Sequence, residues 1–147
     1  MRTRVFNGKE QIFCDWRHKW VRLTPEEWVR QQLLHRLVDE YGYPSSLIAV
    51  EVAFQLPNNS DQLPINAKRF RADAVVYNTA MLPLVLIECK AETVPLTQKT
   101  LDQAIIYNRK LNVPYLILHN GLQTICVNGN NINTSGIPRY TDLLRCE

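Results

Sequence analysis

The chain of 147 residues is poor in the residues on which several common kinds of site depend. It has only five glycines, and no G-x-x-x-x-G-K loop to cradle a nucleotide phosphate. Its four cysteines lie far apart without a C-x-x-C pair, which argues against a zinc site or a disulfide framework. No apolar run approaches the roughly 18 residues of a membrane helix. We therefore expect neither a nucleotide-driven motor nor a membrane protein.

The N-terminal residues Met1 to Arg4 are not followed by an apolar signal segment, so we do not expect export. Unpaired cysteines are typical of a reducing compartment, and a cytoplasmic location follows as the expectation. The length predicts one domain over residues 1–147 with a core of its own. A net charge of +3 is a weak hint of a polyanionic partner.

The hydrophobic periodicity predicts a mixed α/β domain. Thr24-Pro25 opens a helix as a capping threonine followed by proline, and Gly42 closes it. Residues 1–23 read as a short strand or irregular arm, and 129–147 as a tail. The core between them, 24–128, is expected to hold strands at 47–56, 68–77, 84–91, 113–119 and 122–127, with a second helix at 97–111.

The most informative pattern is the apolar run from Leu84 that ends in Glu88-Cys89-Lys90. Side chains alternate faces along a strand, so Glu88 and Lys90 point the same way while Cys89 points to the other face. Charges at the end of a buried strand need a partner, a metal or water. Asp73, in the preceding strand, supplies a second carboxylate if the two strands are neighbours.

Two carboxylates and a lysine at a sheet edge suit metal-assisted phosphodiester hydrolysis. Asp73 and Glu88 are hard oxygen ligands for Mg²⁺ or Mn²⁺, and Lys90 would orient water or stabilise charge on the phosphate. The alternative is a strand end that emerges into solvent, with Glu88 and Lys90 simply hydrated.

The two helices add further candidates. Gln103 and Tyr107 are four residues apart and share a helix face, from which they would reach the nucleic-acid backbone or Lys90. A partly exposed helix flank explains the same pair. Glu27 is accounted for by a capping box, yet it lies at the edge of the core face and is also a candidate metal ligand. Glu51, inside the first strand of the core, is the competing acid.

Basic residues gather in two places in the sequence, at Arg17 to Arg22 and at Lys68, Arg69 and Arg71. Together with Gln103, the second group is the candidate for nucleic-acid binding. Scattered solvated surface charge is the alternative for either group. The three histidines are single and widely spaced, so we interpret them as structural or surface residues.

With these residues in place, the chain resembles the PD-(D/E)xK nuclease superfamily, and in particular the N-terminal nuclease domain of type I restriction enzyme R subunits. The resemblance covers about residues 20 to 128, with Ala72 where the superfamily name has a proline. The segments that carry it are Thr24–Gln31, Arg71–Tyr77, Leu86–Ala91, Gln103–Asn108 and Val113–Gly121.

The resemblance implies an αβββαβ core of the restriction-endonuclease type and a Mg²⁺- or Mn²⁺-dependent DNA endonuclease. It implies a metal held by Asp73, Glu88 and the backbone carbonyl of Cys89, with Glu27 placed less securely. Lys90, Gln103 and Tyr107 would complete the catalytic set. The implied partner is DNA, with a homodimer or a larger restriction or defence complex around it and no nucleotide.

The resemblance leaves the substrate open, because the 147 residues contain no helicase-like motor. The hypothesis from another class is a catalytically inactive nuclease-fold module that binds nucleic acid or a protein partner. An enzyme acting on RNA, or a purely structural Glu/Lys strand end, are the remaining alternatives.

Overall fold

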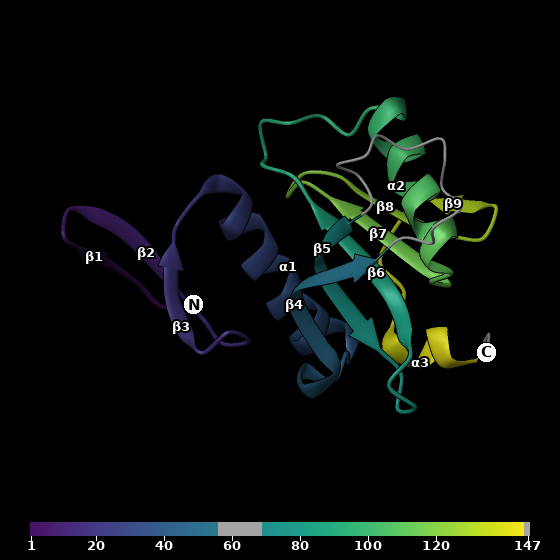
Figure 1. Cartoon of the computed structure of the whole chain (residues 1–147), viewed down its shortest axis with the longest axis horizontal. Helices are drawn as coiled ribbons and strands as arrows, with labels where there is room; N and C mark the ends of the chain where they lie inside the picture. Colours follow the sequence, from purple (N-terminus) through teal and green to yellow (C-terminus); the bar gives the residue numbers. More distant parts are fainter. Residues whose placement is uncertain (56–68, 146–147) are drawn as a thin grey trace.

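The computed structural model describes residues 1–55 and 69–145, with Gln55 and Arg69 described by their backbone alone. The first 23 residues form a three-stranded antiparallel sheet of β1 (Thr3–Phe6), β2 (Lys9–Cys14) and β3 (Lys19–Arg22). Figure 1 shows this sheet beyond α1, at the end of the molecule away from α2. The expectation of a single short strand or irregular arm was wrong.

Helix α1 (Pro25–Tyr41) has the ends that the sequence predicts. The Thr24 side chain accepts a hydrogen bond from the Glu27 backbone N–H, and Pro25 occupies the first turn. Gly42 ends the helix in the left-handed region, with φ of 73°, where glycine carries no steric cost. Its leucines then bury one side of the helix completely, as at Leu33 and Leu37.

The central sheet has six strands in the order β4-β5-β6-β7-β8-β9. Only the β6–β7 pair is parallel, because helix α2 (Gln98–Leu111) crosses over between these two strands. The αβββαβ order and the mixed α/β class expected for the core are therefore confirmed. The strands are β4 (Ile48–Gln55), β5 (Arg69–Tyr77), β6 (Pro83–Cys89), β7 (Tyr115–His119), β8 (Thr124–Asn128) and β9 (Asn131–Asn133).

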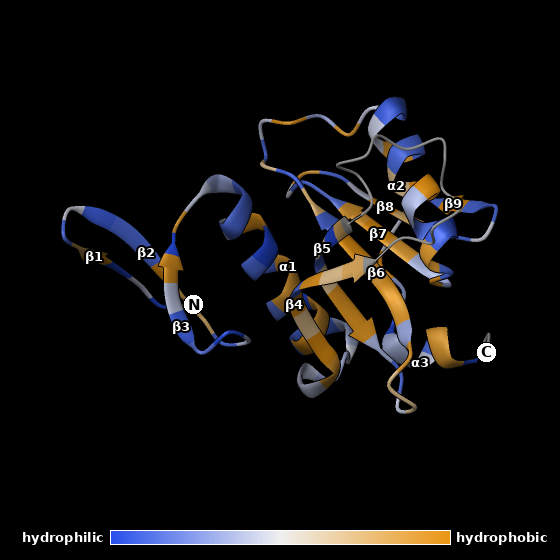
Figure 2. Ribbon diagram, in the orientation of Figure 1, coloured by the Kyte–Doolittle hydropathy of each residue, from blue (hydrophilic) through white to orange (hydrophobic). Residues whose placement is uncertain are grey.

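The two helices cover opposite faces of this sheet. On one face α1 packs its leucines against Val85 and Ile87 of β6. On the other face α2 packs Leu101 and Ala104 against strand residues that include Leu86. Figure 2 shows the central strands as largely hydrophobic and α2 with hydrophilic residues along its length, as expected for a surface helix. The central strands β6 and β7 are thus buried on both sides, whereas the edge strand β9 is exposed.

The C-terminal segment is more ordered than the loop and tail that the sequence predicted. Strand β9 extends the sheet, and helix α3 (Tyr140–Leu144) returns to pack Tyr140 and Leu143 against the α1 face. A short 3-10 helix, Ser45–Leu47, precedes β4. None of the helices in the described part of the chain is long and apolar enough to cross a membrane.

Candidate active site

The last residues of β6 point to opposite faces of the sheet in turn, as the alternation of a strand predicts. Cys89 is fully buried in the core cluster that contains Val85 and Ile87. Glu88 and Lys90 both line a hollow on the opposite face, under α2. The prediction that the two charged residues share a face, away from Cys89, is confirmed.

Asp73 lies beside Glu88 because β5 and β6 are antiparallel neighbours. Their register pairs Ala74 with Ile87, so the next position along brings Asp73 opposite Glu88. The Asp73 backbone N–H donates to Glu88 Oε1 at 3.3 Å. In return the Cys89 backbone N–H donates to Asp73 Oδ2 at 2.7 Å. Two hydrogen bonds thus tie the two carboxylates to the middle of β5 and the end of β6.

The hollow around Glu88 collects four of the five expected catalytic residues. We name it the α2 hollow. It has a volume of about 200 Å³, and α2 supplies Gln103 and Tyr107 to it, as their four-residue spacing predicted. The Tyr107 ring stacks on Phe70 of β5 with 4.4 Å between ring centroids, which fixes its position. The lining residues are Phe70, Glu88, Lys90, Thr100, Gln103, Ala104, Tyr107 and Leu118.

The electrostatics of the carboxylate pair are unusual. Burial raises the pKa of Glu88 to about 8, and the negative charge of Asp73 adds to the effect, while Lys90 only partly opposes it. Burial also raises the pKa of Asp73, against the hydrogen bond from Cys89. Both acids resist ionisation and lie side by side. A bound cation would stabilise their ionised carboxylates.

A second hollow, of about 330 Å³, lies on the α1 side of Asp73, and we name it the α1 hollow. Its charges are compensated. Arg30 Nε donates to Glu27 Oε2 at 2.8 Å, and its Nη1 lies 3.7 Å from Asp73 Oδ1. The lining residues are Arg17, Val21, Arg22, Thr24, Glu26, Glu27, Arg30, Glu51 and Asp73.

Glu27 occupies a different environment from Glu88. Its carboxylate accepts hydrogen bonds from both Arg17 and Arg30. Burial alone would raise the pKa of Glu27, but these bonds and charges outweigh it, and the pKa is lowered. The structure therefore gives Glu27 two guanidinium partners where a metal-ligand role was expected, and the capping role of its backbone is retained.

Glu51, the competing acid, lies opposite Asp73 on the other neighbouring strand. Its φ of 56° is in the left-handed region, which is uncommon for a residue with a side chain. The alternation of side chains along β4 is interrupted at this point: Val50 packs on the α1 face, whereas Val52 packs on the α2 face. Local strain of this kind clusters at functional sites. Glu51 ion-pairs with Arg17 at 3.3 Å, so it too belongs to the compensated network.

The basic group on β5 is only partly described. Arg71 is exposed, and its guanidinium lies 3.8 Å from the Glu51 carboxylate. Lys68 lies outside the described residues, and only the backbone of Arg69 is described. Gln103 is exposed at the rim of the α2 hollow, so it and Arg71 are the accessible members of the predicted nucleic-acid-binding set.

The donor set at the carboxylate pair fits a hard divalent cation. Asp73, Glu88 and the carbonyl of Cys89 supply oxygen atoms only, the ligand type that Mg²⁺ and Mn²⁺ prefer. Over residues 1–55 and 69–145, no group of three or more His, Cys, Asp or Glu side chains is arranged to hold a metal. A metal here would thus rest on two side chains and a backbone oxygen, with water completing its shell.

The sequence analysis did not predict that arginines pair with these acids. Arg30 links Glu27 to Asp73 and accounts for much of the electrostatics of the α1 hollow. The signal was available in part, since an acid and an arginine three apart on a helix are neighbours. Nothing in the sequence indicated that Arg17, from the N-terminal segment, reaches the same carboxylate.

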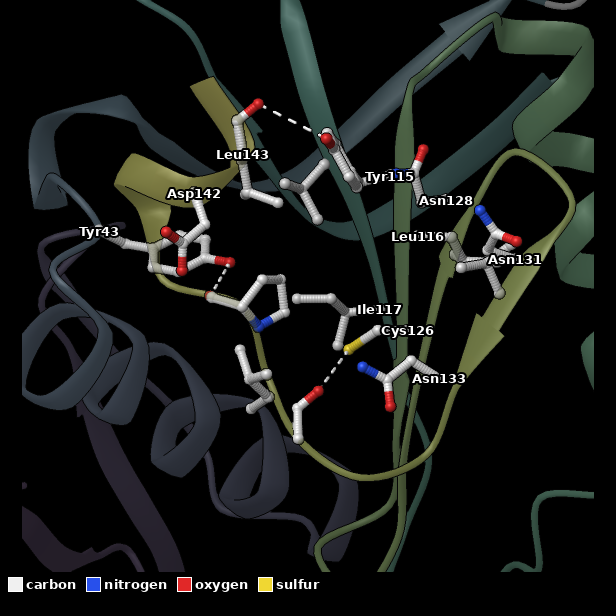
Figure 3. Close-up of a pocket in the computed structure, with 15 residues that line it drawn as sticks. Tyr43, Tyr115, Leu116, Ile117, Cys126, Asn128, Asn131, Asn133, Asp142 and Leu143 are labelled. Carbon is white, nitrogen blue, oxygen red and sulfur yellow. Dashed lines mark hydrogen bonds between the residues drawn. The ribbon is translucent and has the colours of Figure 1, made fainter. Parts of the chain in front are cut away.

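A larger cavity lies elsewhere. It has a volume of about 460 Å³ between β7, β8 and the C-terminal segment (Figure 3). Two of its polar groups donate to backbone carbonyls: the Tyr43 hydroxyl to Pro138 O at 2.9 Å, and Cys126 Sγ to Gly136 O at 3.5 Å. Burial raises the pKa of Cys126 to about 11, which leaves a poor nucleophile. The cavity is therefore a gap between packed elements, and its chemistry differs from that of the carboxylate pair.

Comparison with known proteins places the chain in a family. The family model described as the type I restriction enzyme R protein N terminus matches residues 25–138. A fragment of a putative HsdR subunit of a type I restriction enzyme from Vibrio vulnificus superposes with a TM-score of 0.60 at 18% identity, over 84% of this chain and 25% of that one. A DrdV–DNA complex gives a TM-score of 0.49 at 15% identity, over 78% and 10%.

No curated protein sequence matches the chain. The chain spans about a quarter of the HsdR fragment, so the likeness concerns one domain of that longer protein and shows the shared fold. The family match itself extends from the start of α1 to the segment before α3 and includes every lining residue of the α2 hollow. The chain belongs to the family of type I restriction enzyme R protein N-terminal domains.

Proposed function

We propose that the chain is a metal-dependent DNA endonuclease whose site is the Asp73–Glu88 pair together with the α2 hollow. One observation carries the proposal: two hydrogen bonds hold these carboxylates together beside a hollow that also presents Lys90, Gln103 and Tyr107. Acid, base and amide groups in that combination match the requirements of phosphodiester hydrolysis. Membership of a restriction-enzyme family supports the same reaction.

Each residue has a separate task in this proposal. Asp73, Glu88 and the Cys89 carbonyl would hold Mg²⁺ or Mn²⁺, which when bound supplies positive charge to the phosphate and lowers the pKa of bound water. Lys90, on the same face as Glu88, donates hydrogen bonds to the attacking water or to a phosphate oxygen. Tyr107 and Gln103 border the hollow and position the backbone of the nucleic acid.

The partner is DNA in this proposal, approached along the exposed side of Gln103 and Arg71. Cleavage of both strands of a duplex needs two sites, which a second copy of the chain or a larger restriction complex would supply. The family membership supports the restriction-complex context.

A binding module without catalysis is the second candidate, and one observation favours it. Asp73 Oδ2 already accepts a hydrogen bond at 2.7 Å, and Arg30 lies 3.7 Å from Oδ1. A guanidinium so close competes with a metal for the same carboxylate. On this alternative Asp73 is a structural partner of Arg30, and the hollow only grips a nucleic acid or protein.

The test is cleavage by the purified chain in Mg²⁺ and in Mn²⁺, on duplex, single-stranded and branched DNA. We expect metal-dependent nicking that is lost in both Asp73→Asn and Lys90→Ala and kept in the exposed control Lys99→Ala. The absence of cleavage on every substrate, with DNA binding retained, would establish the binding module instead. Cleavage that survives Lys90→Ala would refute the site.

A further inference from the structure

The N-terminal sheet has one face that carries cations and aromatic rings and no acid. Antiparallel pairing puts Arg4 beside Gln11 and Gln11 beside Arg22, and puts Phe13 beside Trp20. Residues paired in this way point to the same face, and alternation adds every second residue along each strand. We name this the outer face. Its members are Arg2, Arg4, Phe6, Lys9, Gln11, Phe13, Trp20 and Arg22.

The opposite face of the same sheet is turned toward the rest of the molecule. Ile12 and Cys14 alternate with the outer-face residues of β2, and both are fully buried. The Cys14 sulfur accepts hydrogen bonds from Arg17, one of the arginines of the α1 hollow. The outer-face residues are exposed or half-buried, with Phe6 at 51% exposure, and β1 is exposed along its whole length.

Contacts between side chains confirm that the outer-face residues form one surface. The Arg4 guanidinium lies 4.2 Å from the Trp20 ring centroid and 4.8 Å from that of Phe6. Arg2 lies 4.1 Å from the centroid of Phe13. The Phe13 and Trp20 rings meet edge to face at 5.5 Å. Rings and guanidinium planes therefore lie together across all three strands.

The cations of this face form no ion pair with any acid in the part of the chain that the structure describes, although Arg22 borders the acids of the α1 hollow. The face holds four cations, Arg2, Arg4, Lys9 and Arg22, and its neutral polar residue Gln11 accepts a hydrogen bond from Arg4 at 2.8 Å. The acid of these strands, Glu10, alternates to the opposite face. A guanidinium held by a ring and a glutamine keeps its remaining N–H groups available for an anion.

We propose that the outer face is a binding platform for single-stranded nucleic acid. Unpaired bases stack on aromatic side chains and arginine planes, and phosphates pair with cations, so a strand matches both properties of this surface. A duplex hides its base faces and would use the cations alone. The platform lies outside residues 25–138, the part of the chain that the family model matches.

The platform also has a direction. Arg22 belongs to the outer face and at the same time lines the α1 hollow with Asp73. A strand bound across β1, β2 and β3 therefore leaves the sheet beside the proposed site. Binding to the platform does not depend on cleavage, and only this approach to Asp73 rests on the proposed function.

The experiment measures binding of the full chain to a fluorescent oligothymidylate of about 12 nucleotides, within the usual site size, in EDTA so that cleavage plays no part. Arg2→Gln/Arg4→Gln removes two cations, and Phe6→Ser removes one exposed ring at the edge of the sheet. Arg139→Gln/Arg145→Gln is the matched control, since it removes the same charge from exposed residues at the other end of the chain. Thermal unfolding of each variant checks that it is folded.

We expect the arginine pair to weaken binding at least tenfold and to lower the slope of log K against log salt by about 1.4, or about 0.7 for each phosphate contact. Phe6→Ser should weaken binding about fivefold or more through lost stacking, and the control pair should change it less than twofold. An equal loss in the control pair, duplex binding as tight as single-strand binding, or no binding at all would each overturn the proposal.

Discussion

The hollows on either side of Asp73 hold the same kind of residue in opposite electrostatic states. Glu27 in the α1 hollow and Glu88 in the α2 hollow are both glutamates whose pKa burial acts to raise. Two arginines lower the pKa of Glu27, whereas the neighbouring Asp73 helps to raise that of Glu88 to about 8. The partners of the two glutamates differ: guanidinium groups contact Glu27, and a second carboxylate lies beside Glu88.

This contrast distinguishes, within one group of acidic residues, those that stabilise the fold from those that are candidates for a functional role. A carboxylate whose oxygens are taken by guanidinium groups is part of the fold, and its removal leaves buried cations behind. A carboxylate held beside another carboxylate weakens the fold when it ionises, and such a pair is a candidate site for a bound cation. The predictions below alter one hollow at a time.

The largest effect is expected from Glu88→Gln on cleavage. The amide keeps the size of the side chain but removes a charged oxygen ligand, so we expect the rate of metal-dependent cleavage to fall at least about 1,000-fold. Plasmid nicking under single-turnover conditions measures it. Glu92→Gln makes the same change at an exposed position nearby and should leave the rate unaltered. Comparable rates for Glu88→Gln and the unaltered chain would contradict the assignment.

In the α1 hollow, where arginines pair with the acids, we expect substitutions to change the stability of the fold instead. Glu27→Gln leaves Arg17 and Arg30 without their shared carboxylate in a partly buried position, and we expect a loss of about 3 kcal/mol in the free energy of unfolding. Urea unfolding at pH 7 measures the loss. The exposed neighbour Glu26→Gln serves as the control and should stay within about 0.5 kcal/mol. A loss below about 1 kcal/mol in Glu27→Gln would mean that the network is loosely held.

The raised pKa of Glu88 predicts a particular pH dependence. Between its ordinary value of 4.5 and about 8, the folded chain binds a proton that the unfolded chain has released. The free energy of unfolding therefore falls as pH rises through this window, by roughly 2 to 4 kcal/mol, and levels off above it. Glu88→Gln should remove most of the fall and be the more stable protein at pH 8.5.

Divalent cations sharpen the same measurement. Mg²⁺ that binds the folded chain at Glu88 raises its stability by mass action, and most at pH values where the carboxylate is ionised. We expect Mg²⁺ to raise the unfolding temperature of the unaltered chain at pH 8.5 and to leave that of Glu88→Gln unchanged. An equal rise in both proteins would place the cation elsewhere.

Local signals were enough to predict most of the core. The capping Thr24, the closing Gly42 and the alternation that ends in Glu88 and Lys90 are properties of neighbouring residues, and the structure bears each of them out. The prediction for the N-terminal sheet was wrong for another reason. Its Asn7-Gly8 turn is a recognised hairpin signal, with φ of 51° and 74°, but the flanking strands contain several charged residues, and β1 is exposed along its whole length.

The charge partners were beyond the reach of the sequence. Arg17 and Glu27 are ten residues apart on different elements, and Arg30 and Asp73 are separated by 43. Which cation meets which acid depends on how the N-terminal sheet and α1 pack on β5, and no periodicity encodes that packing. The sequence therefore identified the acids well and could not tell which of them were compensated.

The smallest effect is expected at the exposed rim of the α1 hollow. Arg71 lies 3.8 Å from Glu51 with its side chain 69% exposed, so Arg71→Gln should change the free energy of unfolding by no more than about 0.5 kcal/mol. If its guanidinium contacts a phosphate of duplex DNA, the slope of log K against log salt should fall by about 0.9. Arg36→Gln is the control, since Arg36 is also exposed and pairs with Glu40 at 3.5 Å. An unaltered salt slope in Arg71→Gln would assign this arginine to Glu51 alone and leave nucleic-acid contact to other cations.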